Sequence, residues 1–469
     1  MTGEVDRLKK VKDKLDSVSP SFCTAKWLQV TLHLQNGFNH SCHHPQTHKI
    51  PLQEIENNPS ALHNTEYKKQ QRKMMLDGER PSECQYCWNV EDLPGDQLSD
   101  RYIKSGDITW ANDKMEEVAA SDWKEDVTPT YVEVSFSNHC NFKCSYCSPV
   151  HSSQWVSEAK KHGPYPTSQY FNGYDWLEQT GQMPIPHEEY NPYVDAFWKW
   201  WPELSKSLRV FRVTGGDPLM EKNTFRVMDK IIEDPNPALE FSINSNGGVS
   251  RKQIERYVER AKKLETLIRM NRVYTSVDTH GAPAEYARHG LNYDDWLNNI
   301  DYMMTELPRT KFTIMCTANI FSVTNFKRLL EDVYHLKVKH FNKHRKVAIT
   351  IDTSILRWPG HQRANILPPE YADMMQPALD YMKQHEEGNA DFQIPHYQGF
   401  FDFEIAKLER FIEFIRAPKH ADEHYDLETT RKDFYKFVNE HDRRRGTNFQ
   451  ETFPELMDFY NMCKELADD

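Results

Sequence analysis

Three cysteines in this chain are spaced closely enough to hold one metal centre. They are Cys140, Cys144 and Cys147, in the pattern Cys-x3-Cys-x2-Cys. A four-iron cluster needs one thiolate per iron, so three thiolates leave one iron without a protein ligand. An iron of this kind can bind and activate a small molecule. Three cysteines could instead belong to a structural zinc site, and their spacing alone leaves that alternative open.

The elements that position this loop alternate between strands and helices. Residues 131–136 alternate between apolar and polar and end directly before the cysteines, which indicates a strand leading into a metal loop. Helices separate further predicted strands near residues 208–214, 239–243, 273–278, 312–317 and 347–352. Such alternation favours parallel βα units. Six units predict an α/β fold built on an open, partial (β/α)6 barrel.

Polar motifs follow three of these strands, at the ends where reactive groups gather in such folds. They are Thr214-Gly215-Gly216-Asp217-Pro218, then Asn244-Ser245-Asn246-Gly247, then Ser276-Val277-Asp278 with Arg288 ten residues later. Paired glycines let a backbone approach a ligand closely. A guanidinium such as that of Arg288 pairs bidentately with a carboxylate. We therefore expect the strand ends to form one binding site with the cysteine loop.

In strand order, these motifs resemble those of radical SAM enzymes. The resemblance implies a 4Fe-4S cluster on Cys140, Cys144 and Cys147, whose open iron binds S-adenosylmethionine (SAM). In that family an electron from the cluster cleaves SAM, and the resulting 5'-deoxyadenosyl radical abstracts hydrogen from a substrate. Asp217 replaces the usual Glu of a Gly-Gly-Glu motif, and Arg288 is expected near the methionine carboxylate. The implied cofactor contacts are Tyr146, Gly215, Gly216, Asp217, Asn244, Ser276, Asp278 and Arg288.

Four other cysteines precede the predicted barrel. Cys23 and Cys42 flank a predicted hairpin with its turn at Asn36-Gly37, and Cys84 and Cys87 form a Cys-x2-Cys pair. Four thiolates complete either a tetrahedral zinc site or a closed iron-sulfur cluster, and histidines 33, 40, 43, 44 and 48 could supply a ligand. The spacing Cys23-x13-Gly37-x4-Cys42 resembles the opening of a twitch module, which implies a second, auxiliary 4Fe-4S cluster. In better-known members this module follows the core, whereas here it comes first.

These signals divide the chain into five predicted parts. They are an N-terminal helix (1–20), a twitch-like module (21–95), a linker with a short helix near 112–120 (96–129), the radical SAM partial barrel (130–360) and a helical C-terminal segment (361–469). The barrel carries an aromatic insertion, residues 149–207, which we interpret as either core packing or a substrate wall. The basic run Arg443 to Arg445 is predicted to be a solvated helix end, within a tail that resembles those of twitch-domain proteins.

Composition and net charge exclude some classes of protein. The chain has 469 residues and a net charge of -12, the wrong sign for tracking nucleic acid. It contains no apolar run of the length of a signal or a membrane span, so we expect a cytoplasmic protein. In that compartment its nine cysteines are better interpreted as metal ligands or buried thiols than as disulfides. Cys316 and Cys463 stand alone and are assigned no chemistry.

The sequence therefore predicts an iron-sulfur oxidoreductase or maturase that acts by hydrogen abstraction. The expected partners are a peptide or sugar-like substrate and an electron donor such as flavodoxin or ferredoxin, with no nucleic acid and no membrane. An auxiliary cluster favours net oxidation of the substrate. The alternative is a zinc-stabilised binding module without catalysis, which would not need the Gly-Gly-Asp and Ser-x-Asp strand ends.

Overall fold

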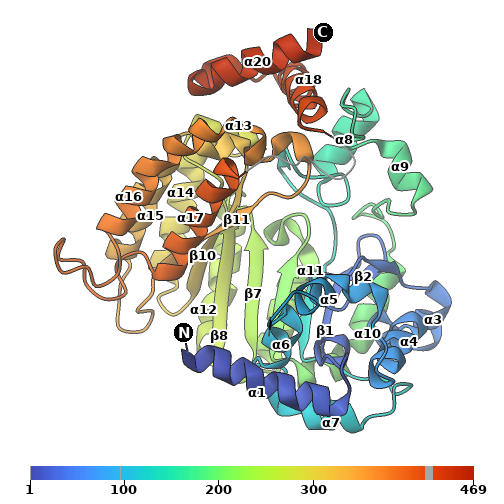
Figure 1. Ribbon diagram of the computed structural model, residues 1–469. Helices are drawn as coiled ribbons and strands as arrows, with labels where there is room; N and C mark the ends of the chain where they lie inside the picture. The colour runs from blue at the N-terminus through green and yellow to red at the C-terminus, as the bar shows by residue number, and fades with distance from the viewer. Residues whose placement is uncertain (1, 96, 418–425, 469) are drawn as a thin grey trace.

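One largely parallel sheet forms the centre of the molecule (Figure 1). The computed structural model describes residues 2–95, 97–417 and 426–468. Within these ranges nine strands form one sheet, in the order β11-β10-β8-β7-β6-β4-β1-β2-β3, and β5 pairs with β9. The strands are β1 (Gln29–His33), β2 (Phe38–His40), β3 (His48–Lys49), β4 (Tyr131–Ser135), β5 (Lys143–Cys144), β6 (Val210–Thr214), β7 (Glu240–Ser245), β8 (Met270–Ser276), β9 (Arg288–His289), β10 (Lys311–Ala318) and β11 (Ile349–Ile355).

The six strands predicted for the barrel are present and neighbour one another in chain order. From β4 through β6, β7, β8 and β10 to β11, every pair is parallel. This confirms an α/β fold with a largely parallel sheet, while the size of the barrel stays a prediction. The first strand of the predicted hairpin also joins this sheet. β1 pairs with β2 across the expected turn and with β4 in parallel, Val30 opposite Val132.

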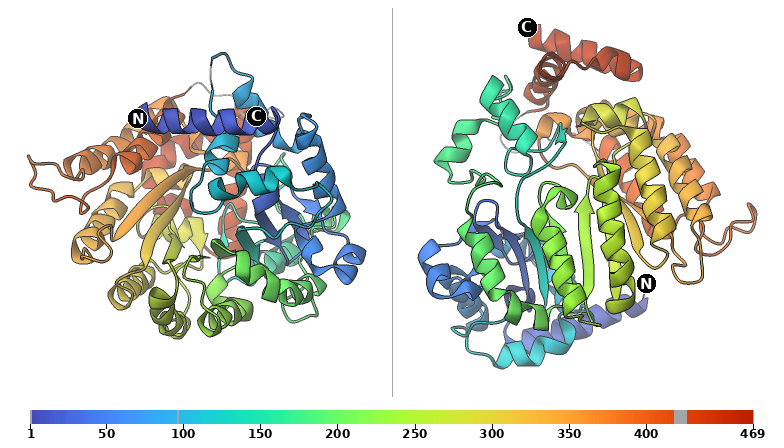
Figure 2. Two further views of the ribbon diagram at one scale, coloured as in Figure 1. Left: turned by 90° about the horizontal axis from the view of Figure 1, so that it is seen from below. Right: turned by 180° about the vertical axis from the view of Figure 1, so that it is seen from behind.

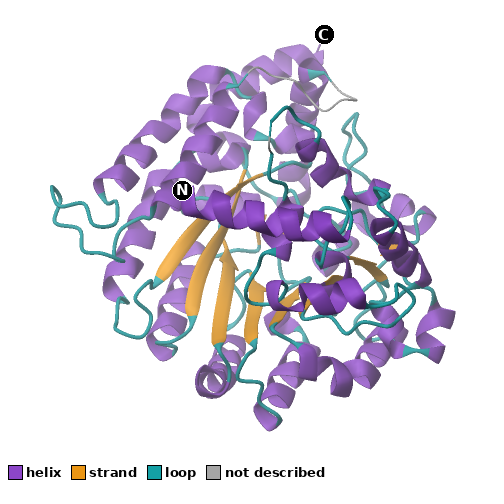
Figure 3. Ribbon diagram, turned by 60° about the horizontal axis from the view of Figure 1, so that its bottom comes forward, coloured by secondary structure: helices purple, strands orange, loops and turns teal. Residues whose placement is uncertain are grey.

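Alternation along the strands gives the sheet one apolar and one polar face. Val132, Val134 and Phe211 are buried on the apolar face. Helices α10, α11 and α12 cover this side, as the view from behind in Figure 2 shows. Glu133 and Arg212 alternate with these residues and lie on the opposite face. Figure 3 shows the strands of the curved sheet side by side, with helices around them.

Helices surround the sheet. Those of the first half are α1 (Thr2–Val18), α2 (Ala25–Leu28), α3 (Leu52–Asn57), α4 (Glu66–Leu76), α5 (Gln85–Glu91), α6 (Asp100–Ser105), α7 (Met115–Ala120), α8 (Ser153–His162), α9 (Tyr174–Gln179) and α10 (Pro192–Ser207). The later ones are α11 (Lys222–Glu233), α12 (Arg251–Leu267), α13 (Ala282–Ala287), α14 (Tyr293–Glu306), α15 (Phe326–Lys339), α16 (Gln376–Gln384), α17 (Asp402–Arg416), α18 (Leu427–Arg445), α19 (Phe449–Thr452) and α20 (Met457–Asp468). In the described ranges, no helix is long and apolar enough to cross a membrane.

Local signals explain several helix boundaries. α12 begins at the capping box formed by Ser250 and Gln253, and α18 ends at Gly446, whose φ of 67° is left-handed, as is common at helix C-termini. α1 buries Leu8, Val11 and Leu15 along one face, so this N-terminal helix packs against the rest of the chain. It crosses one end of the molecule, while α18 and α20 lie at the other (Figure 1).

The segment predicted to be a linker is folded and packed. It contains α6 and α7, and its Tyr102 and Trp110 are buried in the same apolar cluster as Trp27. High charge favoured a linker for this segment, but its buried aromatic residues pack in one cluster with residues of α1. The part of the chain between residues 96 and 129 therefore contributes to the N-terminal module, although the exact domain boundaries stay predictions.

Candidate active site

The three-cysteine loop follows β4 directly, at the carboxyl end of the parallel strands. Its middle forms β5, which pairs antiparallel with β9 so that Cys144 lies opposite Arg288. Cys140 is buried, Cys144 and Cys147 are half-buried, and all three are free thiols. A loop of this kind places three sulfur ligands on a few residues of backbone, held by the neighbouring strand ends.

Buried side chains from distant segments hold the backbone of this loop. Ser152 Oγ donates to the Phe142 carbonyl at 2.6 Å and Trp155 Nε1 to the Cys144 carbonyl at 2.9 Å. Arg445 Nη1 donates to the Lys143 carbonyl at 2.7 Å, and the Arg445 side chain is 0% exposed. The predicted solvated helix end is therefore wrong for Arg445, because this guanidinium is buried against the cysteine loop.

The glycine pair after β6 packs directly on the cysteine loop. Gly215 has a φ of 114°, and a Cβ added there would lie 2.3 Å from Ser135 Oγ. A Cβ at Gly216 would lie 2.2 Å from the His139 carbonyl oxygen. The Gly216 amide donates to the Ser137 carbonyl at 3.1 Å. Larger residues would push the two loops apart, since Cβ atoms cannot approach other atoms this closely.

Asp217 is buried and joins the ends of two strands. Its carboxylate accepts from Ser245 Oγ at 2.9 Å and from the Asn246 amide at 2.7 Å, both at the end of β7. It also accepts from the Leu219 amide at 2.9 Å. Burial raises the pKa of Asp217 to about 6. Asp217 thus orders the loops after β6 and β7, and its predicted contact with SAM stays a prediction.

The motif after β7 contributes a residue that sequence reasoning missed. Asn246 Nδ2 donates to Cys140 Sγ at 3.8 Å and to Asn141 Oδ1 at 2.8 Å. Asn244, the residue predicted to contact the cofactor, instead accepts from Arg212 Nε at 2.8 Å. The two asparagines are two residues apart, so the motif alone did not distinguish which of them faces the cysteines. The cofactor contact of Asn244 stays a prediction.

Tyr146, Asp278 and Arg288 meet in one buried network. Asp278 Oδ2 accepts from Tyr146 Oη at 2.7 Å and from Arg288 Nε at 3.0 Å. Arg288 Nη1 donates to Cys144 Sγ at 3.8 Å. Ser276 is half-buried, two residues before Asp278 on the end of β8. The structure therefore places Asp278 and Arg288, which belong to the motif after β8, beside the cysteine loop.

The donor set of this loop fits a 4Fe-4S cluster. Three thiols come from one loop, and two of them already receive N–H donors from Asn246 and Arg288. Burial raises the pKa of the Cys147 thiol to about 12 and raises the pKa of the other two thiols as well. Without metal these thiols are protonated, so cluster assembly must displace their protons. The chemistry of the residues matches what three-cysteine cluster loops require.

Comparison with known families agrees with this geometry. Residues 134–320 match the model of the Radical SAM superfamily. The chain carries a radical SAM domain. The match begins in β4 and ends after β10, and thus includes the cysteine loop and the strand ends described above. Radical SAM proteins are enzymes, and the family implies a 4Fe-4S cluster and SAM.

Curated relatives share parts of the chain. The GTP 3',8-cyclase of Nautilia profundicola is 26% identical over 149 residues, 32% of this chain and 35% of the relative. The GTP 3',8-cyclase of Desulforamulus reducens is 24% identical over 208 residues, 43% of this chain and 52% of the relative. That of Aliarcobacter butzleri is 25% identical over 149 residues. The chain thus spans about a third to a half of the length of the curated relatives it matches.

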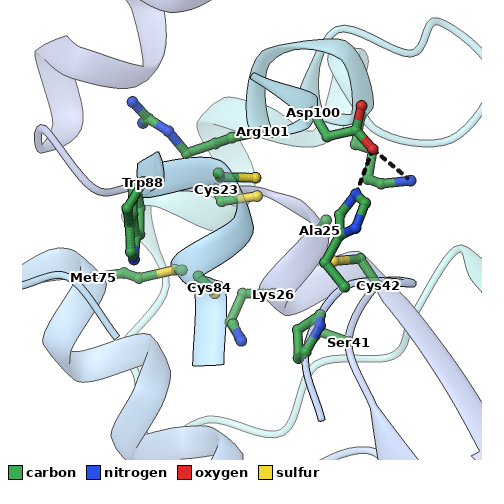
Figure 4. Close-up of a pocket in the computed structure, with 14 residues that line it drawn as sticks. Cys23, Ala25, Lys26, Ser41, Cys42, Met75, Cys84, Trp88, Asp100 and Arg101 are labelled. Carbon is green, nitrogen blue, oxygen red and sulfur yellow. Dashed lines mark hydrogen bonds and ion pairs between the residues drawn. The ribbon is translucent and has the colours of Figure 1, made fainter. Parts of the chain in front are cut away.

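Beside the radical SAM domain, the four N-terminal cysteines line one pocket. Cys23 precedes α2, Cys42 follows β2, and Cys84 and Cys87 stand at the start of α5. Figure 4 shows Cys23, Cys42 and Cys84 around the pocket, with Lys26 among them. In the described residues, no group of three or more His, Cys, Asp and Glu side chains is placed to hold a metal ion, and this applies to the 140–147 loop as well as to this pocket. The auxiliary cluster therefore stays a prediction, although its four predicted ligands are gathered.

Buried cations surround this second cysteine set. Arg101, on α6, makes a bidentate ion pair with Glu91, at 3.0 and 2.9 Å. Lys26 pairs with Glu83. Burial lowers the pKa of Lys26, but Cys84 and Glu83 raise it more, so the net pKa is above its usual value. Because each cation is paired with a carboxylate, the two pairs add no net charge beside the four cysteines. Sequence reasoning missed Arg101 because its segment was interpreted as a linker.

The histidines of this region are tied to other partners. His44 Nε2 lies 2.7 Å from Asp100 Oδ2, and its ring stacks on Tyr86. His48 Nε2 lies 3.0 Å from Thr65 Oγ1. Burial lowers the pKa of His40 to about 4 and of His48 to about 3. Burial therefore keeps His40 and His48 neutral near pH 7, whereas His43 is exposed.

The aromatic insertion has a buried part and an exposed part, and its role as a substrate wall stays a prediction. Trp200 and Phe197 on α10 are buried in the core. Tyr170 and Trp176 are 44% and 45% exposed, and they line a groove with Trp358 and His151. His151 is accessible to water, yet burial lowers its pKa, as expected for a ring that faces a recess. The groove therefore runs to the segment just after Cys147.

Proposed function

We propose that this protein is a radical SAM enzyme that cleaves SAM reductively and abstracts hydrogen from a substrate. Cys140, Cys144 and Cys147 would hold the 4Fe-4S cluster, leaving one iron open for SAM. When bound, cluster and SAM together supply the 5'-deoxyadenosyl radical. The single observation that carries the proposal is the convergence of three strand ends on this loop, with Asn246 and Arg288 donating to two of its sulfurs.

The chain's own residues hold the cysteine loop and the neighbouring strand ends in place. Gly215 and Gly216 let the loop after β6 lie against the cysteine loop. Asp217 fixes the end of β7. Arg445, in α18, fixes the carbonyl of Lys143. Rigid support of this kind matters because a reactive group displaced by about 1 Å can lose about a hundredfold in rate.

Two observations bear on the substrate. The groove of Tyr170, Trp176 and Trp358 offers flat apolar faces beside His151, which suits a peptide or a sugar-like molecule. The relatives are GTP 3',8-cyclases, so GTP is a further candidate to assay. We propose an electron donor such as flavodoxin or ferredoxin as the partner that reduces the cluster.

Anaerobic reconstitution tests this function directly. We expect brown protein with iron and sulfide for two 4Fe-4S clusters, about eight iron atoms per chain. After reduction, added SAM should yield 5'-deoxyadenosine slowly without substrate, because the open iron suffices for uncoupled cleavage. Metal analysis, absorbance spectra and product chromatography measure these quantities. Colourless protein that contains zinc would contradict the enzyme proposal.

The gathered N-terminal cysteines support a second cluster that accepts an electron. Four thiolates leave no iron open, so such a cluster transfers electrons rather than binding substrate. After hydrogen abstraction, a substrate radical that loses one electron ends as an oxidised product. We therefore propose net oxidation, such as dehydrogenation or bond formation, with the N-terminal module as the acceptor.

Cys84→Ala separates the two clusters. We expect folded C84A protein to keep the cluster of the 140–147 loop and its uncoupled SAM cleavage, with about half of the iron. Product formation, measured by mass spectrometry once a substrate is in hand, should fall at least tenfold. A folded C84A variant that lacks the second cluster and still gives full product yield would leave the module a structural role only.

A further inference from the structure

Arg288 is held between a carboxylate and a cluster cysteine. Its Nε and Nη2 atoms donate to Asp278 at 3.0 and 2.9 Å, which fixes one edge of the guanidinium. Nη1, on the other edge, lies 3.8 Å from Cys144 Sγ. The backbone contact of β5 with β9 places Cys144 and Arg288 opposite each other. Arg288 is 6% exposed, so little water competes for these contacts.

The carboxylate that orients Arg288 has its oxygens fully engaged. Asp278 Oδ1 accepts from the Thr317 amide at 2.9 Å and from Arg288. Oδ2 accepts from Tyr146 Oη at 2.7 Å and from Arg288. Asp278 is 0% exposed. With four donors on two oxygens, this carboxylate is saturated, and it holds Arg288 in place.

A second donor serves another cysteine of the loop. Asn246 Nδ2 lies 3.8 Å from Cys140 Sγ, and its Oδ1 accepts from the Gly248 amide at 2.8 Å, which fixes the orientation of its amide. The two donors differ in charge. Arg288 brings a positively charged N–H, itself paired with Asp278, to one sulfur, whereas Asn246 brings a neutral N–H to another.

We propose that Arg288 sets the reduction potential of the cluster on the 140–147 loop, with Asp278 and Tyr146 as the residues that position it. This inference rests on the proposed function. A cation beside a ligating sulfur stabilises the cluster after it gains an electron, and hydrogen bonds to the sulfurs are among the determinants of cluster potential. The low dielectric of a buried site strengthens the effect. In this proposal Arg288 acts on the cluster through Cys144 and does not bind the methionine carboxylate.

The test is a redox titration of the full-length, reconstituted protein, monitored by electron paramagnetic resonance. The signal that changes on addition of SAM identifies the cluster with the open iron. We expect Arg288→Gln to lower the equilibrium constant for reduction of this cluster at least tenfold, a shift of about 59 mV for a one-electron couple. Arg288→Lys should restore most of the shift, because it keeps the charge. The matched control is Arg260→Gln, a half-buried arginine on α12 that pairs with Asp229 on α11, and it should leave the potential unchanged.

SAM affinity separates this role from the one that the resemblance implies. We expect the Kd for SAM in Arg288→Gln to change by less than about threefold. Equal potentials in wild-type and Arg288→Gln proteins with intact clusters would overturn the inference, as would a tenfold loss of SAM affinity without a shift. If Arg288→Gln does not fold, Tyr146→Phe tests the same network, with a smaller shift in the same direction and no shift as the contrary result. A wild-type chain that takes up no iron would instead refute the proposed function itself.

Discussion

Replacing Cys140, Cys144 and Cys147 together by Ala should remove one cluster and abolish SAM cleavage. The three thiols are the ligands that one loop supplies, and the side chains around them donate N–H groups rather than further metal ligands. We expect iron to fall from about eight to about four atoms per chain, because the N-terminal set keeps its own cluster. 5'-Deoxyadenosine should drop to the level of a reaction without protein. Iron analysis and chromatography of the reduced, SAM-treated variant measure both.

The matched control for this variant is Cys463→Ala. Cys463 is 0% exposed in α20 and is assigned no ligand role, so its replacement should keep both clusters and full SAM cleavage. Circular dichroism spectra of the triple variant and the wild type should agree if the variant is folded. The assignment fails if the folded triple variant retains both clusters, or if it still cleaves SAM.

Replacing Arg445 by Met should destabilise the protein by about 3 to 5 kcal/mol, the range for removing one partner of a buried ion pair. Arg445 donates to Glu158 at 3.1 Å, with side chains 0% and 3% exposed. Burial by itself raises the pKa of Glu158, but Arg445 and Lys143 lower that pKa by more, so the net value is about 2. Without Arg445, a buried carboxylate and the carbonyl of Lys143 lose a donor. Thermal and denaturant unfolding measure the loss of stability, and cluster content should fall with it.

Arg443 offers a control from the same basic run. Its side chain is 60% exposed and pairs with Glu440 on its own helix, so Arg443→Met should change stability by less than about 1 kcal/mol. Equal effects of the two substitutions would show that burial of Arg445 against the cysteine loop contributes nothing. The pair thus tests whether the C-terminal helix α18 supports the site.

The sequence determined those features that depend on neighbouring residues. Cysteine spacing within the 140–147 loop and apolar alternation in the segment that forms β4 are local patterns, and each led to the element that the structure contains. Local periodicity fixes which face of a strand or helix is buried. The order of the parallel strands followed as well, because successive βα units usually lie side by side. The match of residues 134–320 to the radical SAM family agrees with the motifs found at these strand ends.

Tertiary structure alone decided which partners those residues meet. β1 extends the barrel sheet by pairing with β4 across about a hundred residues, and Arg445 reaches the Lys143 carbonyl over a separation of 302 residues. Asn246 rather than Asn244 donates to Cys140, since the turn after β7 sets which amide faces the cysteines. Such contacts form only when distant segments close on each other, so no local pattern encodes them. The basic run in the sequence therefore indicated exposure for Arg445, whereas the fold buries its side chain with a carboxylate partner.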